Sequence, residues 1–298
     1  MIETNGLTVY YGRHRGIDGL TMTVDPAQVY GFLGPNGAGK TTTLRVLLDI
    51  IRPSRGTAEL FGLDCQKDGV EIRRRVGYLP GELSLYPQLR ASQYLNMVNS
   101  VRGNTADPAY ISYLCDYLSL DPSRRMRTYS RGNKQKIGLV AAFMGRPELL
   151  LLDEPTSGLD PLVQQSVLDL VRQARDEGRT VFLSSHVLSE VQAVCDRVGI
   201  IRDGRLAATE SVEDLVHGQI HRITMRFEQM PPVGLFDQDG LSEISRGDQH
   251  VTVEVTEGLN RMLLQAARYG VSDIETHQVS LEDVFMRYYG RSGGAASD

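Results

Sequence analysis

A glycine-rich loop between an apolar segment and an amphipathic one constrains this chain more than any other feature. The loop runs Gly34-Pro35-Asn36-Gly37-Ala38-Gly39-Lys40-Thr41-Thr42 and follows the apolar segment Gln28–Leu33. It matches the pattern G-x-x-x-x-G-K-[ST], which wraps backbone N–H groups around phosphate oxygens when it joins a strand to a helix. Apolar residues recur at helical spacing in Thr43–Leu48, directly after the loop. The loop therefore predicts an α/β fold with a nucleoside triphosphate site.

Two side chains at the end of this loop carry the expected chemistry. Lys40 would neutralise charge on the β- and γ-phosphates, and the hydroxyl of Thr41 would complete the shell of a Mg²⁺ ion. The helix that begins beside them adds its positive end. A fortuitous glycine turn is the alternative, and the flanking strand and helix argue against it. We expect ATP or GTP, together with Mg²⁺, as ligands.

A second apolar run, Leu149–Leu152, ends in the acids Asp153 and Glu154. A buried strand that delivers carboxylates at its C-terminal end places them where α/β folds bind ligands. Asp153 would then hold Mg²⁺, and Glu154 would polarise the water that attacks the γ-phosphate. Alternatively, two acids before Pro155 only end a strand and cap a turn.

Polar residues also follow two later patterns. Asp160 precedes Pro161, the arrangement of a helix cap and a first helical turn. The apolar segment Thr180–Leu183 leads through two serines to His186. His186 could contact the γ-phosphate there, although a histidine after a strand is more often a surface residue.

Short apolar strands alternate with helical segments up to about Gly204, which indicates a mainly parallel sheet. The expected strands are Gln28–Leu33, Arg75–Leu79, Leu149–Leu152, Thr180–Leu183 and Val198–Ile201. Asp203-Gly204 is typical of a tight hairpin turn. Between about 86 and 143 the strand signals fade and apolar residues recur at helical spacing, which predicts a helical insertion. We expect one nucleotide-binding domain over residues 1–217.

The last part of the chain, residues 218–298, has a different character. His221–Phe227 and His250–Val255 alternate apolar and polar residues, as half-buried strands do. Glu257–Arg268 is typical of a helix that closes near Gly270. We expect a small α+β domain here, with a disordered tail rich in Gly, Ala and Ser.

Charge and cysteine content limit the possible partners and the compartment. The net charge of −5 gives no global attraction to nucleic acid or anionic lipid. The three cysteines are widely spaced and lack metal-ligand spacing, which favours reduced thiols in the cytosol. No run approaches the roughly 18 apolar residues of a spanning helix, and the N-terminus does not read as a signal peptide. A membrane role would therefore depend on a partner.

The order of these segments resembles the nucleotide-binding subunit of ATP-binding cassette (ABC) transporters, over about residues 1–217. The segment Tyr129-Ser130-Arg131-Gly132-Asn133-Lys134-Gln135-Lys136 lies just upstream of the Asp-Glu strand, where that family carries its Leu-Ser-Gly-Gly-Gln signature. Ser130 and Gly132 match the signature, and the neighbouring positions depart from its commonest form. Without the resemblance, this segment would be interpreted as a turn that starts a helix.

The resemblance implies a second copy of the chain as a partner. In this family two cassettes pair head to tail, so that the phosphate loop of one and the signature of the other enclose each ATP. The implied ligands of the partner's ATP are Ser130, Arg131, Gly132 and Asn133, at the start of a helix. Tyr11 resembles the aromatic residue that stacks on adenine. Asp160 matches the loop that crosses the dimer seam, and His186 matches the family's switch histidine.

One departure from the family bears on metal binding. After the strand that ends at Pro80, the family usually places a glutamine that touches Mg²⁺ and relays to the membrane subunit. Gly81 stands there in this chain, followed by Glu82. Gly81 cannot ligate a metal through a side chain, whereas Glu82 can. The candidate metal ligands are therefore Thr41, Asp153 and Glu82.

The C-terminal domain resembles the accessory segment of exporter cassettes of the drug-resistance and antibiotic-export type (ABC-2), including its ending Val279–Phe285. The resemblance implies an ATPase subunit that powers export through a separate integral membrane permease, at the cytoplasmic face of the cell membrane. Importer subunits remain an alternative.

Two other classes of protein share these motifs. Soluble ATPases that act on DNA carry long coiled coils between the phosphate loop and the signature, and this chain has no heptad repeats there. Relatives that act on ribosomes carry two cassettes in one chain. A non-catalytic binding subunit conflicts with the presence of Glu154 and His186. We expect no nucleic-acid partner.

Overall fold

The computed structural model describes residues 1–12, 14–217 and 221–278. The chain divides into two compact units, one ending at Ser211 and the other beginning at Val212. The boundary predicted from the sequence, at residue 217, lies a few residues after the boundary in the structure, because helix α8 (Val212–His217) is grouped with the second unit.

The first unit is built on a six-stranded sheet with the strand order β10-β9-β3-β8-β7-β6. Its parallel strands are β3 (Val29–Leu33), β6 (Val76–Leu79), β7 (Leu149–Asp153), β8 (Thr180–Ser185) and β9 (Arg197–Arg202). They correspond to the five strands predicted from the sequence, and β3, β7 and β8 are buried throughout. Strands covered on both faces are read as unbroken apolar runs, which is why the sequence located them.

The edge strand β10 (Arg205–Ser211) runs antiparallel to β9. Between them Asp203 and Gly204 both have positive φ, 49° and 77°. The predicted hairpin turn is therefore confirmed.

A second, mainly antiparallel sheet was not predicted. It consists of β1 (Ile2–Tyr11), β2 (His14–Val24), β4 (Arg55–Leu60) and β5 (Leu63–Asp64), in the order β2-β1-β4-β5. The pairing of β1 with β2 shifts register after Thr4, Leu7 and Val9. Such bulges break the alternation of apolar and polar residues, so the period that marks a strand is lost from the sequence.

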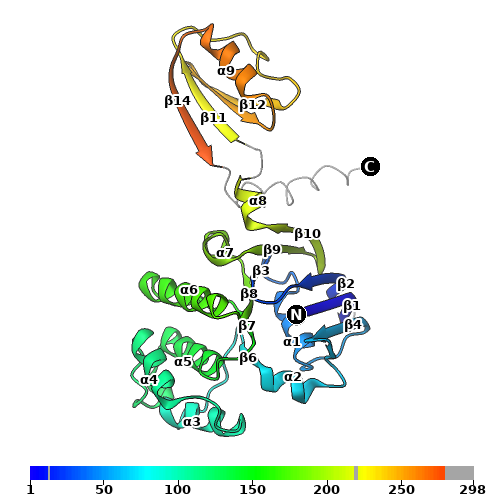
Figure 1. The fold of residues 1–298 in the computed structure, drawn as a ribbon, viewed down its shortest axis with the longest axis vertical. Helices are drawn as coiled ribbons and strands as arrows, with labels where there is room; N and C mark the ends of the chain where they lie inside the picture. The colour runs from blue at the N-terminus through cyan, green and yellow to red at the C-terminus, as the bar shows by residue number, and fades with distance from the viewer. Residues whose placement is uncertain (13, 218–220, 279–298) are drawn as a thin grey trace. The chain divides into compact units, whose positions relative to one another are not determined.

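The helices of the first unit lie on both sides of the central sheet. They are α1 (Lys40–Leu47), α2 (Gly69–Arg75), α3 (Ala91–Val101), α4 (Pro108–Tyr117), η1 (Met126–Thr128), α5 (Arg131–Phe143), α6 (Pro161–Asp176) and α7 (Leu188–Val194). Helices α3 to α6 gather on one side of β6 and β7, and the antiparallel sheet lies on the other (Figure 1). The predicted helical insertion is thus formed by α3, α4 and α5.

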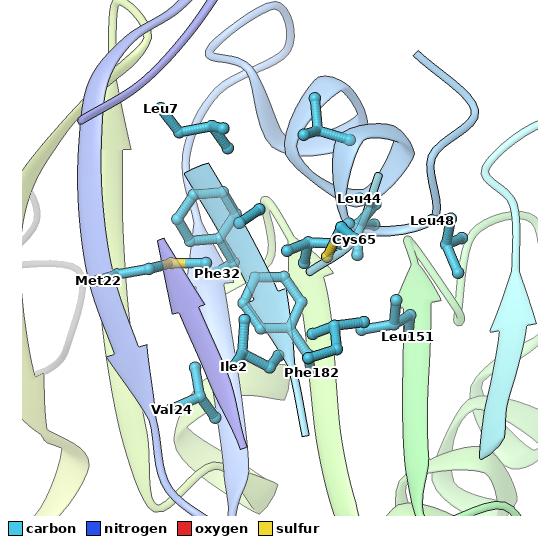
Figure 2. Packing of buried hydrophobic residues seen from close by; sticks show 14 of the residues in the cluster. Ile2, Leu7, Met22, Val24, Phe32, Leu44, Leu48, Cys65, Leu151 and Phe182 are labelled. Atoms are coloured by element: carbon cyan, nitrogen blue, oxygen red, sulfur yellow. The ribbon is translucent and has the colours of Figure 1, made fainter. Parts of the chain in front are cut away.

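The main apolar core lies between the two sheets and fixes the start of α1. The rings of Phe32 on β3 and Phe182 on β8 have centroids 5.3 Å apart. Figure 2 shows them beside Ile2 and Met22 of the antiparallel sheet, with Leu44 of α1 near by. All of these side chains are buried. This packing anchors both ends of the loop between β3 and α1.

The second unit has its own core around a four-stranded antiparallel sheet in the order β12-β13-β11-β14. Its elements after α8 are β11 (His221–Phe227), β12 (Leu241–Arg246), β13 (His250–Val255), α9 (Leu259–Ala267) and β14 (Val271–Gln278). The predicted strands β11 and β13 and the helix are confirmed. The predicted tail and the ending Val279–Phe285 lie outside the described residues. None of the helices described in either unit is long and apolar enough to cross a membrane.

Candidate nucleotide site

The predicted site residues that follow the strands converge, because four neighbouring parallel strands end at the same edge of the sheet. In the order β3, β8, β7, β6, these strands lead into the phosphate loop, His186, Glu154 and Gly81. Strand register places Asp153 beside Ser184 and Leu33 beside Ser185. Motifs far apart in sequence therefore meet at the carboxyl ends of the strands, as α/β folds require.

The phosphate loop has a backbone that only glycine accommodates at its last turn. Gly39 has φ of 111°, and a Cβ atom there would lie 2.6 Å from the carbonyl oxygen of Gly16. Helix α1 begins at the next residue, Lys40, whose side chain is buried. Its Nζ donates to the carbonyl oxygens of Gly34 at 2.6 Å and Pro35 at 3.2 Å. The loop thus holds an ammonium group and a helix N-terminus together, a suitable site for phosphate.

Asp153 and Thr41 form the centre of the predicted metal site. The carboxylate of Asp153 is fully buried, and its Oδ2 accepts a hydrogen bond from Thr41 Oγ1 at 2.7 Å. Its Oδ1 accepts one from Ser184 Oγ at 2.5 Å. Hydroxyl and carboxylate oxygens suit Mg²⁺. The described residues contain no group of three or more His, Cys, Asp or Glu able to hold a metal.

Glu154 projects into the site from a strained backbone. Its φ is 50°, which is uncommon for a residue with a side chain. Glu154 Oε2 lies 2.6 Å from His186 Nδ1. Its Oε1 is buried, accepts no hydrogen bond from the described residues and lies 3.3 Å from Lys40 Nζ. This carboxylate stands between Lys40 and His186, where it can orient a water and accept its proton.

Two adjoining pockets, of about 310 and 440 Å³, share Asn36, Thr41 and Glu154 as walls. The first is lined by Tyr11, Arg15, Gly16 and the phosphate loop from Pro35 to Thr42, without Ala38. The second is lined by Arg45, Gly81, Glu82, Arg131, Asp153, Ser157 and His186 in addition to the shared walls. The phosphate loop thus borders the first pocket, Asp153 and His186 border the second, and Glu154 borders both.

Comparison with known proteins agrees with this geometry. The family model described as ABC transporter matches residues 17–157. The bacitracin transport ATP-binding protein of Bacillus licheniformis is 39% identical over 69% of this chain and 68% of its own length. The daunorubicin/doxorubicin resistance ATP-binding protein of Streptomyces peucetius is 38% identical over 72% of this chain and 66% of its own.

The chain belongs to the ATP-binding proteins of ABC transporters. It is an ATPase subunit of that family, and the two relatives above are named for bacitracin transport and for daunorubicin/doxorubicin resistance. A dimeric ATP-binding cassette solved with ADP and phosphate shares the fold, with a TM-score of 0.65 and 18% identity over 71% of this chain and 99% of that one.

In this ABC cassette the signature segment is used differently from the phosphate loop. Ser130 caps α5, because its Oγ accepts a hydrogen bond from Asn133 N at 3.2 Å. Gly132 packs so tightly that a Cβ atom would lie 2.7 Å from the carbonyl oxygen of Gly158. Arg131 Nη2 donates to Ser157 Oγ at 3.3 Å and reaches the second pocket. Within the described residues, Ser130, Gly132 and Asn133 line neither pocket.

Two further predicted residues have local roles in the cassette. Asp160 caps α6 through a hydrogen bond from Val163 N to its Oδ1 at 3.1 Å, as its position before Pro161 predicted. It lines neither of the two pockets as far as the structure describes them. Tyr11 lines the first pocket, and its hydroxyl lies 3.4 Å from Thr42 Oγ1.

Gly81, at the position where the resemblance predicts a glutamine, lies beside the predicted metal ligand Asp153. A Cβ atom on Gly81 would lie 3.0 Å from Asp153 Oδ2. A side chain there would thus begin beside the carboxylate of Asp153, and glycine leaves the space open. Glu82 is exposed and lines the same pocket as Asp153, together with Arg45.

Several contributors to the site were not predicted, and some of them had a usable signal. Arg45 follows Thr41 by one helical turn, so it faces the same side of α1. Burial and the charge of Asp153 raise the pKa of Tyr78 to about 12, against the opposing effect of Arg45. Ser184 binds both Asp153 and the backbone N of Glu154, which only strand register reveals. Arg15 reaches the first pocket from β2, in the sheet that the sequence did not predict.

Proposed function

We propose that two copies of this cassette pair head to tail around two ATP molecules, and that hydrolysis then separates them. The observation that carries the proposal is a division within one chain. The phosphate loop, Asp153, Glu154 and His186 surround the pockets, whereas Ser130 and Gly132 of the signature are not among the described residues that line them. A second copy would supply its signature to close the site.

Each phosphate-side residue has a specific task in this scheme. The amides of Gly34–Gly39 and the ammonium of Lys40 bind the β- and γ-phosphates. Thr41 and Asp153 hold Mg²⁺, which when bound neutralises charge on the phosphate oxygens. Glu154 orients the attacking water and takes its proton, and His186 holds that carboxylate in place. Tyr11 stacks on the adenine ring.

The partner copy faces the same nucleotide with its own signature. The amides at the start of α5, from Arg131 to Asn133, and the Ser130 hydroxyl would bind the γ-phosphate of the partner's ATP, because a helix N-terminus favours an anion. Asp160 and its loop would lie at the seam between the copies. Glu82 would supply the third metal-side oxygen in place of the family's glutamine, since it lines the pocket beside Asp153.

The work of this cycle is proposed to be export through a separate membrane permease, with the cassette held at the cytoplasmic face of the membrane. The transport and drug-resistance names of the relatives support this partner and suggest an antibiotic-like cargo. Within the described residues no helix is suited to crossing the bilayer, so the translocation path would lie in the other protein.

Glu154→Gln tests the pairing and the chemistry together. Turnover should fall about 10²- to 10⁴-fold because the amide cannot accept the proton. The variant should elute as a dimer in Mg-ATP and as a monomer without nucleotide, measured by size exclusion with light scattering. Glu148→Gln is the matched control: Glu148 immediately precedes β7, at the other end of that strand, and pairs with Arg75 at 2.8 Å. A single-copy Glu154→Gln protein in excess Mg-ATP would overturn the proposed pairing.

The permease requires a separate experiment. The tagged chain, purified from detergent-solubilised membranes of its own source, should retain a polytopic protein that has no cassette of its own. After reconstitution of the pair in nanodiscs, antibiotic-like compounds should stimulate ATP hydrolysis. If the reconstituted membrane protein neither changed turnover nor bound the cassette, the export proposal would fail while ATP hydrolysis stood.

A further inference from the structure

Gln135 is a buried polar residue that none of the site's predicted roles uses. It lies on α5 and is 7% exposed. Its Nε2 donates to the carbonyl oxygens of Glu154 at 3.1 Å and Pro155 at 3.2 Å. The side chain therefore spans from the signature helix to the backbone of the residue that activates water.

The peptide groups around Glu154 are fixed from both sides. Glu154 N donates to Ser184 O at 3.1 Å and lies 3.2 Å from Ser184 Oγ, on the neighbouring strand β8. Gln135 binds the carbonyl on the other side. Between these contacts the backbone adopts φ of 50°, which directs the carboxylate toward Lys40 and His186. A strained conformation persists only where its surroundings over-determine it.

Helix α5 contacts the turn from Glu154 to Gly158 at two further points. Arg131 donates to Ser157 Oγ at 3.3 Å, and Gly132 packs against the carbonyl of Gly158. These residues belong to the first turn of the helix, next to the cap at Ser130. The helix start and the turn from Glu154 to Gly158 are thus joined by packing and hydrogen bonds, so a shift of one moves the other.

We propose that Gln135 is the positioning residue that holds Glu154 in its hydrolytic conformation and transmits the state of the signature helix to it. Transmission from the signature helix rests on the proposed function, because only a partner's nucleotide would act on the start of α5. The positioning of Glu154 by Gln135 concerns one chain alone. In the absence of this bond, Glu154 relaxes toward an ordinary backbone conformation and its carboxylate leaves His186.

Gln164 provides a matched control within the same turn. Its Nε2 donates to Thr156 O at 3.4 Å and Leu159 O at 3.1 Å, from helix α6. Gln164→Leu and Gln135→Leu each remove a glutamine that binds two carbonyls of one turn. Only Gln135 touches the carbonyl of Glu154. If Gln135 only satisfied hydrogen bonds of the turn, the two variants should lose equal amounts of kcat. If Gln135 positions Glu154, Gln135→Leu should lose more kcat than Gln164→Leu.

The first measurement separates kcat from nucleotide affinity. Gln135→Leu should lower kcat about 10- to 100-fold, with the Kd for a fluorescent ATP analogue unchanged within about twofold. Gln164→Leu should lower kcat less than about threefold, at a comparable loss of thermal stability. Equal kcat losses in the two variants, or a Gln135→Leu kcat within threefold of the parent, would overturn the proposal.

The pH dependence of Gln135→Glu gives a readout that survives if the leucine variant does not fold. An ionised carboxylate cannot donate to the two carbonyls and is repelled by them, whereas a protonated one donates once. Burial raises the pKa of such a carboxyl, so protonation becomes accessible near neutral pH. Turnover relative to the parent chain should rise as pH falls from about 8 to 6. A ratio independent of pH would contradict a role for the donated hydrogen bond.

Failure of this inference can be told from failure of the pairing scheme. The double variant Gln135→Leu with Glu154→Gln should still pair in Mg-ATP, because it lacks only the positioning of a group already inactivated. If Glu154→Gln alone did not pair, the proposed function would be wrong. If Glu154→Gln paired and the double variant did not, Gln135 would serve the seam and not Glu154.

Discussion

The phosphate loop and the signature segment belong to the same proposed site, yet the chain holds them by different means. Lys40 and Thr41 are bonded to the residues they work with, since Thr41 binds Asp153 and Lys40 faces Glu154. Ser130 and Gly132 are used for a helix cap and for packing on Gly158. In the proposed scheme the first region is complete in a single chain, and the second acts only on the nucleotide of a second copy. Changes in the first should therefore weaken nucleotide binding, and changes in the second should spare it.

Lys40→Ala should have the largest effect on this comparison. The variant loses a charge-assisted contact to phosphate in a buried loop, so affinity for ATP should fall about 100-fold and turnover should reach background. Isothermal titration with ATP on the single chain measures the affinity directly. Lys67→Ala, which removes an exposed lysine paired with Asp64, is the control. Retained affinity in Lys40→Ala would mean that the loop does not bind phosphate through this residue.

Ser130→Ala should separate the two regions most clearly. Losing a cap costs about 1 kcal/mol of stability, and Asp107→Ala removes an equivalent cap from α4. Ser130→Ala should lower turnover about 30-fold and weaken ATP-dependent pairing, with single-chain ATP affinity unchanged. Asp107→Ala should match it in thermal stability and leave turnover near the parent value. If both variants lost turnover equally, Ser130 would be a helix cap and nothing more.

The two regions also differ in how far the sequence could predict them. The parallel strands and the residues after them were located because a buried strand is an unbroken apolar run and its polar end faces the ligand. The phosphate loop and Asp153 could therefore be placed together before any coordinates. The caps at Ser130 and Asp160 were also readable, since each precedes a helical pattern.

Contacts that depend on sheet register or side-to-side packing were beyond the sequence. Ser184 meets Asp153 only because β7 and β8 are neighbours in a specific register. The antiparallel sheet, which brings Arg15 to the first pocket, is interrupted by bulges that erase its period. Gln135 lay in the quoted signature segment, yet its target, the carbonyl of Glu154, is a backbone atom that no pattern of side chains encodes.

Tyr11→Ala tests the outer edge of the phosphate-loop region. The ring is about half exposed and lines the first pocket, so its expected contribution is stacking on the base. Stacking of a base on an aromatic side chain contributes about 1–3 kcal/mol, so ATP affinity should fall about tenfold with little change in kcat. Tyr11→Phe keeps the ring and loses only the long contact to Thr42, so it should bind ATP as the parent does. Equal losses in both variants would assign the effect to the hydroxyl instead of the ring.

Gly81→Gln should have the smallest effect, and it examines the one element that belongs to neither region. The new Cβ would begin 3.0 Å from Asp153 Oδ2, so the carboxylate must move by a few tenths of an ångström while the new amide oxygen gains access to the metal. These consequences oppose each other, and we expect the Mg²⁺ concentration for half-maximal turnover to change only about threefold. Glu82→Gln in the same assay shows whether the carboxylate of Glu82 contributes to Mg²⁺ binding in the parent chain. If Glu82 is the metal-side oxygen of the parent chain, its loss should raise the Mg²⁺ requirement, and Gly81→Gln in the same chain should restore it. A double variant that is no better than Glu82→Gln would mean that a side chain at position 81 does not reach the metal, and that in this variant Asp153 and Thr41 hold Mg²⁺ with phosphate and water alone.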